Sequence, residues 1–116
     1  MRESLTKKER LKRKADITRV FREGKAVRCS GTHLRTADND LGYNRVAFTC
    51  VKRFGNAVER NRAKRVAREI YRKGKSNLKP GHDLVFILYP DVRTYTDRDR
   101  HIRFLLSEAG LVHDTE

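Results

Sequence analysis

The sequence predicts an α+β fold in which helices pack on a mixed β-sheet, and three stretches support this. Residues 45–52 are rich in β-branched and aromatic side chains, and residues 83–89 form a continuous apolar run, so both are expected to be strands. Residues 55–73 have the periodicity of an amphipathic helix. Because this helix connects the two strands, we expect them to run parallel within one sheet. A chain of 116 residues corresponds to a single domain, 1–116.

The chain begins with a strongly basic segment, residues 1–14, followed by a short amphipathic helix. The segment has little apolar surface, so we expect a loosely ordered basic arm. Its cationic residues are Arg2, Lys7, Lys8, Arg10, Lys12, Arg13 and Lys14. Helical periodicity starts near Asp16, places Ile17 and Phe21 on one side, and stops at Gly24.

An alternating pattern follows over residues 28–37. Thr32, Leu34 and Thr36 fall on one side of it, with His33 and Arg35 on the other. Residues 39–42 supply turn-forming side chains before the strand at 45–52. We therefore expect an antiparallel hairpin of 28–37 with 45–52, and the pattern leaves room for a further short strand at 26–29.

The helix at 55–73 has its own start and stop signals. Asn56 is a good N-cap, Glu59 is placed to complete a capping box, and Gly74 is expected in the left-handed conformation that ends many helices. A narrow apolar stripe would face the sheet, made of Ala63, Val66, Ala67 and Ile70.

The opposite side of this helix is strongly basic, and Glu69 is its only acid. The cations are Arg62, Lys64, Arg65, Arg68 and Arg72. A solvated helix face usually mixes signs, because like charges four residues apart oppose helix formation. The row of Lys64, Arg68 and Arg72 therefore favours an anionic partner over a merely solvated surface.

The last part of the chain predicts a central strand and a final helix. Residues 79–81 break the chain, 83–89 are apolar enough to be covered on both faces, and 91–94 form a loop. We expect Thr96 to cap the helix, with Asp99 at the third helical position, and Gly110 to end it. Its apolar stripe consists of Ile102, Leu105, Leu106 and Ala109.

The net charge of +13 and the pI of about 10.4 predict a polyanionic partner, either nucleic acid or an acidic membrane surface. No apolar run approaches the roughly 20 residues of a membrane span, and the N-terminus lacks the apolar core of a secretory signal. We expect a cytoplasmic protein without a membrane partner. Cys29 and Cys50 are expected to be free thiols, and the spacing of Cys29 and His33 alone does not complete a zinc site.

Enzymatic chemistry in the protein itself is disfavoured. The acidic residues are dispersed, the four histidines fall in different elements, and no P-loop, GxSxG or HExxH motif occurs. The sequence indicates a binding protein.

Residues 52–65, followed by Arg68 and Glu69, closely resemble the signature of the bacterial ribonuclease P protein subunit. The run reads KRFGNAVERNRAKR, and its core, RNRxKR within GNAVxRNRxKR, is highly specific. The similarity covers nearly the whole chain. It includes Leu11-Lys12-Arg13, Asp16 with Val20-Phe21, Gly24-Lys25, the strand before the signature, and Gly81-His82-Asp83.

This resemblance implies a function. The protein would bind ribonuclease P RNA, a large catalytic RNA, and together they would remove the 5′ leader from precursor tRNA. The RNA would carry out the Mg²⁺-dependent hydrolysis, so no catalytic residue, cofactor, metal or protein partner is expected for the protein. The implied fold is an αβββαβα sandwich of three helices and a four-stranded mixed sheet, with a left-handed crossover through the basic helix against the usual right-handed rule. The basic arm would be loosely ordered without RNA.

The resemblance also implies two RNA-binding surfaces. The helix with the signature would face the catalytic RNA, and a cleft between the first helix and the sheet would hold the single-stranded leader. The expected contacts to the catalytic RNA are Arg53, Asn56, Arg60, Asn61, Arg62, Lys64, Arg65, Arg68 and Arg72. The expected contacts to precursor tRNA and its leader are Lys12, Arg13, Ile17, Phe21, Arg35 and Lys52.

Two positions depart from the family pattern. Ile17 and Arg35 occupy positions where aromatic side chains are usual, whereas Phe21 is retained. If both line the cleft, Arg35 shifts leader binding from stacking toward charge. The alternative is that Ile17 is a core residue beside Val20 and that Arg35 faces solvent.

Two other classes fit the composition. A small ribosomal protein is separated from the leading interpretation only by the signature. A DNA-binding module is disfavoured, because the chain lacks helix-turn-helix spacing and two strands precede its basic helix.

Overall fold

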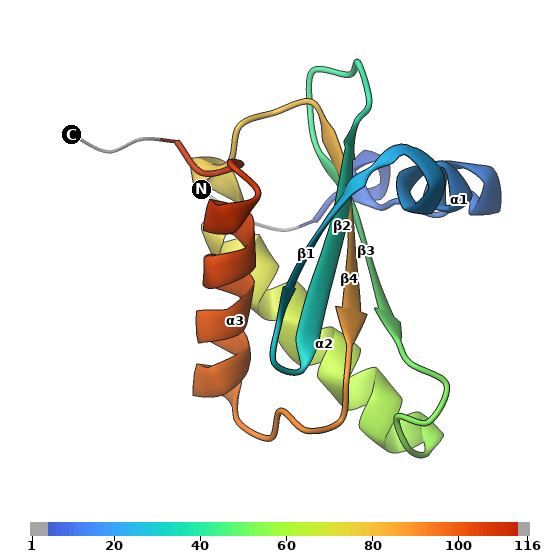
Figure 1. Cartoon of the computed structure of the whole chain (residues 1–116), viewed down its shortest axis with the longest axis vertical. Helices are drawn as coiled ribbons and strands as arrows, with labels where there is room; N and C mark the ends of the chain where they lie inside the picture. The colour runs from blue at the N-terminus through green and yellow to red at the C-terminus, as the bar shows by residue number, and fades with distance from the viewer. Residues whose placement is uncertain (1–4, 114–116) are drawn as a thin grey trace.

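The computed structural model describes residues 5–113, and within them three α-helices pack on one four-stranded sheet (Figure 1). The main elements are α1 (Lys14–Glu23), β1 (Lys25–Cys29), β2 (Thr32–Asp38), β3 (Arg45–Cys50), α2 (Ala57–Gly74), β4 (His82–Leu88) and α3 (Tyr95–Glu108). Short 3₁₀ turns, η1 (Lys7–Glu9) and η2 (Lys75–Asn77), precede α1 and follow α2. This order confirms the αβββαβα prediction, including the short strand near 26–29.

The strand order is β1-β2-β4-β3, which differs in one respect from the sequence-based expectation. The parallel pairing of β3 with β4 is confirmed. The expected hairpin between 28–37 and 45–52 is wrong: β2 pairs with β1 on one side and with β4 on the other. The reason is that β4 is buried along nearly its whole length, so it takes the interior position and separates β2 from β3.

The true hairpin joins β1 to β2 through Ser30 and Gly31. Gly31 has a φ of 79°, a conformation that favours glycine, and Cys29 pairs directly with Thr32. The turn residues at 39–42 instead lead from β2 across the end of β4 to β3.

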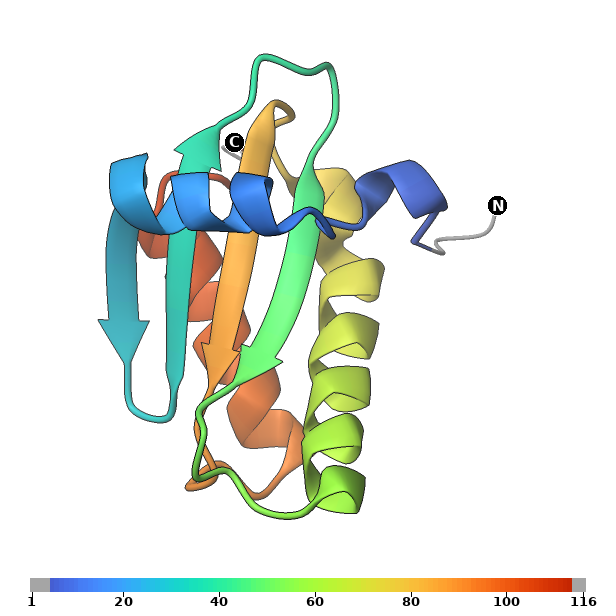
Figure 2. The same cartoon turned by 90° about the vertical axis from the view of Figure 1, so that its right-hand side faces the viewer.

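The β3–α2–β4 connection is left-handed (Figure 2). Both strands run in the same direction, β4 lies between β3 and β2, and α2 returns on the face of the sheet opposite α1. Most such connections are right-handed. The handedness implied by the family resemblance is confirmed.

The two faces of the sheet are covered unequally. The face toward α2 and α3 carries the main core, in which the Phe48 and Phe86 rings stack at 5.5 Å and Tyr71 packs edge-on against both. The other face is covered by α1 and by Leu11 of the segment before it, through a small cluster around Val20 and Val85. In Figure 2, α1 crosses the strands near one end and leaves the rest of that face uncovered.

Two helix ends differ from the prediction. Gly74 has a φ of −106° and leads directly into η2, so it is not a left-handed cap. The N-cap of α3 is Thr94 rather than Thr96, and its hydroxyl accepts a hydrogen bond from the Asp97 N–H at 3.1 Å. The predicted end of α3 is confirmed, since Gly110 has a φ of 75°.

The described part of the N-terminal segment packs on the sheet, unlike the loose arm that we expected. Leu11 is 4% exposed, and its N–H donates to the Val46 carbonyl at 2.9 Å. Lys75, at the end of α2, forms a 3.0 Å ion pair with Glu9. The many charged residues of this segment led to the expectation of a loose arm, and the contribution of Leu11 to the core was overlooked. Arg2 lies outside the described residues.

The buried carboxylate of Asp83, near the start of β4, links the sheet to α1. Asp83 is fully buried and accepts hydrogen bonds from Arg45 at 2.8 and 2.7 Å and from Asn39 at 2.9 Å. On α1, Arg19 lies 3.4 Å from Asp83, and Asp16 lies 3.4 Å from Arg45. Burial raises the pKa of Asp83, but the hydrogen bonds from Arg45 and Asn39 outweigh it, so this pKa lies below its usual value.

Candidate nucleic-acid interface

The start of α2 is held by the predicted capping box. The Asn56 side chain accepts from the Glu59 N–H at 2.9 Å, and the Glu59 carboxylate accepts from the Asn56 N–H at 3.0 Å. Two of the four free N–H groups at this helix end are thereby satisfied. The signature residues that follow stand on a rigid first turn.

The outward side of α2 presents a set of side chains that we name the basic face. Its members are Asn61, Arg62, Lys64, Arg65 and Arg68. Lys64 is half-buried and the other four are exposed. Within residues 5–113 none of the five forms an ion pair or a side-chain hydrogen bond. Their donors are available to an external anion.

Other predicted contacts to the catalytic RNA have partners inside the protein. Arg60 is half-buried and donates to the carbonyls of Val51 and Lys52 at 3.0 and 3.2 Å, so it holds the β3–α2 loop. Arg72 forms a 2.7 Å ion pair with Glu69, which relieves the row of like charges at its C-terminal end. Arg53 is exposed in the loop before the helix.

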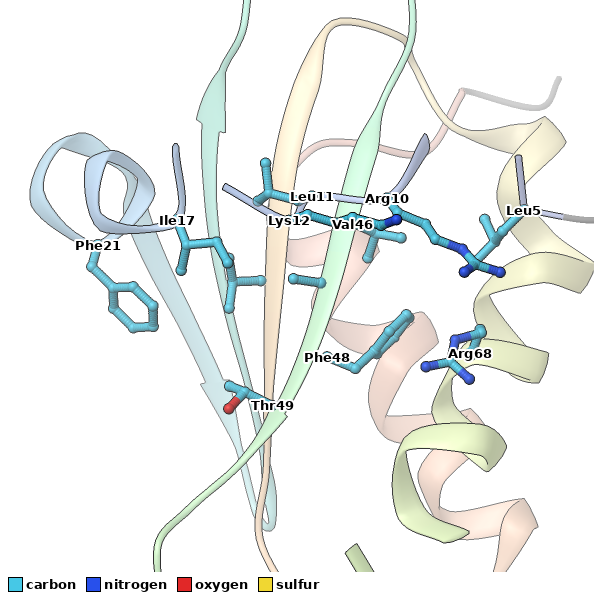
Figure 3. A pocket seen from close by; sticks show the side chains of 12 residues that line it. Leu5, Arg10, Leu11, Lys12, Ile17, Phe21, Val46, Phe48, Thr49 and Arg68 are labelled. Carbon is cyan, nitrogen blue, oxygen red and sulfur yellow. The ribbon is translucent and has the colours of Figure 1, made fainter. Parts of the chain in front are cut away.

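A hollow of about 470 Å³, which we name the α1 groove, runs beneath α1 and around the edge of β3 (Figure 3). It brings together three of the predicted leader contacts, Lys12, Ile17 and Phe21. Ile17 is half-buried and packs on the Val20 cluster while it also lines the groove, so the two interpretations of this residue are compatible.

The remaining predicted leader contacts do not line the α1 groove. Arg35 is nevertheless next to Phe21: it donates to the Phe21 carbonyl at 3.0 Å, and its guanidinium lies 5.3 Å from the centre of the Phe21 ring. It is therefore half-buried rather than turned to solvent. Arg13 and Lys52 are exposed, at the start of α1 and in the β3–α2 loop.

Sequence reasoning missed several groove residues. Arg10, from the N-terminal segment, and Arg68, from α2, both line the groove, and the Phe48 ring lies near Arg68 (Figure 3). Arg10 could not be singled out within a uniformly basic arm. Arg68 was assigned to the helix face, and the structure shows that it also lines the groove.

The uncovered part of the sheet continues from the α1 groove with polar and aromatic side chains. His33 and Tyr89 have ring centres 4.6 Å apart. Burial, then the neighbouring charges of Arg28 and Arg35, lower the pKa of His33, so its imidazole is neutral at pH 7. The alternation over residues 28–37 correctly placed His33 and Arg35 on one face.

The described residues contain neither a cluster of metal ligands nor a helix that could span a membrane. Among them, no three His, Cys, Asp or Glu side chains are grouped as metal ligands would be. Cys29 and Cys50 are free thiols. In the same part of the chain, no helix has the length and apolar character of a membrane span. Together, the basic face and the α1 groove define a small α+β protein of the nucleic-acid-binding class.

Comparison with known proteins narrows this class. The model of the ribonuclease P family matches residues 5–108, and the chain belongs to this family. A ribonuclease P protein component from Alkaliphilus metalliredigens is 32% identical over 105 residues, which is 89% of this chain and 95% of that protein. One from Clostridium acetobutylicum is 36% identical over 110 residues, 91% of this chain and 92% of its own length.

Solved structures agree. The ribonuclease P protein of Staphylococcus aureus matches with a TM-score of 0.83 at 26% identity, over 90% of this chain and 98% of that one. That of Thermotoga maritima matches with a TM-score of 0.78 at 27% identity, over 86% and 96%. The chain is therefore a subunit of ribonuclease P, which matures the 5′ ends of tRNA, and it binds ribonuclease P RNA within the holoenzyme.

Proposed function

We propose that this chain binds ribonuclease P RNA with the basic face of α2 and holds the 5′ leader of precursor tRNA in the α1 groove. The hydrolysis, with its Mg²⁺ ions, belongs to the RNA subunit in this proposal. The protein positions the substrate and lowers the repulsion between two polyanions. The expected compartment is the cytoplasm, where precursor tRNA is made.

The observation that carries this proposal is the continuity of the two surfaces. Arg68 belongs to the basic face and also lines the α1 groove. A strand lying in the groove is therefore next to RNA bound on α2, which is the arrangement needed to present a leader to a catalytic RNA.

The chemistry of the α1 groove suits a single strand. Phe21 is 39% exposed and offers a ring for base stacking, and Ile17 adds an aliphatic surface. Lys12, Arg10 and Arg68 supply positive charge for phosphates. Sites for single-stranded nucleic acid combine these two elements. The neighbouring Arg35 adds charge where an aromatic ring is usual in the family.

The protein's own side chains support the assignment of catalysis to RNA. Mg²⁺ sites are built from converging carboxylates, and the acids near the interface are already engaged: Glu59 in the capping box and Glu69 with Arg72. The purified chain should therefore cleave nothing. RNA-free cleavage that survives nuclease treatment would contradict this part of the proposal.

The test compares binding of precursor and mature tRNA by the reconstituted holoenzyme. Phe21→Ala should weaken binding of the leader-bearing precursor by about 5- to 150-fold, the range of one lost stack, and leave mature tRNA unaffected. Arg35→Ala should act in the same direction and also reduce the salt dependence. The control is Phe104→Ala, which removes an exposed ring on α3 far from the α1 groove. Equal losses for precursor and mature tRNA would place the leader elsewhere.

A further inference from the structure

A second hollow, of about 460 Å³, lies on the other flank of α2, and we name it the α3 hollow. It is bounded by the first half of α2, the loop that leaves β4, and the start of α3. Its volume lies within the roughly 300–1,000 Å³ of small-ligand sites. The six lining residues that matter are Phe54, Glu59, Arg62, Arg93, Tyr95 and Arg98.

The two hollows flank the same helix. Arg62 lines the α3 hollow and Arg68 lines the α1 groove. These residues are six positions apart, so on a helix with 3.6 residues per turn they point about 120° away from each other. The basic face between them forms a ridge, and RNA bound on this ridge lies next to both hollows.

The α3 hollow contains a buried cation without a buried acid. Arg98 is 3% exposed, and its guanidinium donates to Gly31 O at 2.9 Å, Thr32 Oγ1 at 2.9 Å and Tyr89 O at 3.2 Å. All three acceptors are neutral, and a guanidinium has five donors. The exposed carboxylate of Asp91 offsets part of the cost of burying this charge, and an anion bound nearby would offset more of it.

The other charged groups lining the hollow increase its positive potential. Arg62 and Arg93 are exposed, and within residues 5–113 neither forms an ion pair. The only acid in the lining is Glu59, whose carboxylate accepts from the Asn56 N–H in the capping box. The lining therefore contains three arginines and a single carboxylate, which already accepts a hydrogen bond within the protein.

Aromatic side chains complete the site. Tyr95 is 44% exposed, and Lys73 Nζ lies 5.8 Å from the centre of its ring; Phe54 also lines the hollow. Arginines bind phosphate through paired N–H donors, and an exposed ring stacks on a base. The combination suits a nucleotide better than a simple anion.

We propose that the α3 hollow binds one unstacked nucleotide of ribonuclease P RNA, with its phosphate on Arg62 and Arg93 and its base against Tyr95. This rests on the proposed function, because it requires that RNA lies on α2. An RNA strand is favoured over a free nucleotide because Arg62 belongs both to the hollow and to the basic face.

The first experiment uses fluorescence. The chain contains no tryptophan, so Tyr95→Trp places a single indole in the hollow. Saturation with ribonuclease P RNA should quench its emission through stacking on a base. Phe104→Trp places an indole on the same helix outside the hollow and should change little. Unchanged emission from Tyr95→Trp would overturn the proposal, and so would quenching by adenosine monophosphate without any by RNA.

The second experiment measures affinity for the same RNA. Tyr95→Ala should weaken binding about tenfold, Arg93→Ala should reduce the salt slope by about 0.7–0.9, and Phe104→Ala should do neither. Arg65→Ala, on the basic face, tests the binding of RNA on α2 separately from the α3 hollow. If it weakens binding while Tyr95→Ala and Arg93→Ala do not, the α3 hollow is refuted and the proposed function stands. If none of the three weakens binding, the placement of RNA on α2 is refuted as well.

Discussion

Asp83→Asn should destabilise the protein more than any other change of a single charge. The carboxylate is fully buried, and the substitution replaces one of its oxygens with an amide donor directed at Arg45. Removing one partner of a buried ion pair costs about 3–5 kcal/mol. Because the Arg45 side chain is 21% exposed and can regain water, we expect about 3 kcal/mol.

The corresponding shift in melting temperature follows from chain length. An unfolding entropy of about 2.1 cal/mol/K per residue gives about 0.24 kcal/mol/K for 116 residues, so 3 kcal/mol lowers the Tm by about 12 °C. Thermal unfolding followed by circular dichroism measures this shift. The matched control is Glu23→Gln, which removes an exposed acid also bonded to Arg19 and should shift the Tm by less than about 2 °C.

The pH dependence gives a second check on Asp83. Its folded-state pKa is depressed below the ordinary 3.8, so its stabilisation is complete above that pH and is lost as the pH falls further. The stability difference between the parent protein and Asp83→Asn should therefore narrow below about pH 4. A Tm shift no larger than that of Glu23→Gln, or a gap that does not change in acid, would refute the role assigned to the Asp83 cluster.

Two further predictions concern the arginines of α2 and the response to anions. Arg60→Ala should lower the free energy of unfolding of the free protein by about 1–3 kcal/mol, because Arg60 donates hydrogen bonds to two loop carbonyls. Arg65→Ala should leave the stability measured by urea unfolding unchanged. Equal effects of the two substitutions would refute the structural role assigned to Arg60. Sulfate or pyrophosphate should raise the Tm more than chloride at matched ionic strength, because binding of these anions to the folded state adds to the screening of the +13 charge. Equal shifts would mean that screening by itself accounts for the stabilisation.

Features built from neighbours in the chain could be predicted from the sequence. The capping box of α2 joins residues three apart, and the apolar stripes of α2 and α3 follow from 3.6 residues per turn. The burial of β4 followed from its continuous apolar run. The basic face could likewise be predicted from the sequence, because helical spacing alone places its side chains together. The ribonuclease P signature is one continuous run through the β3–α2 loop and the first half of α2, so the resemblance was visible without any tertiary contact.

The tertiary structure decided what depends on residues distant in sequence. The apolar run of β4 indicated a central strand, but the strand patterns do not show that its neighbours are β2 and β3, because each strand has two edges and side-chain alternation does not distinguish them. The α1 groove and the α3 hollow exist only where α2 meets segments about 50 and about 30 residues away, a separation over which periodicity carries no information. For the same reason, Arg60 and Arg62 looked alike in the sequence. Packing of the β3–α2 loop leaves Arg60 bound to backbone carbonyls and Arg62 open to an external anion.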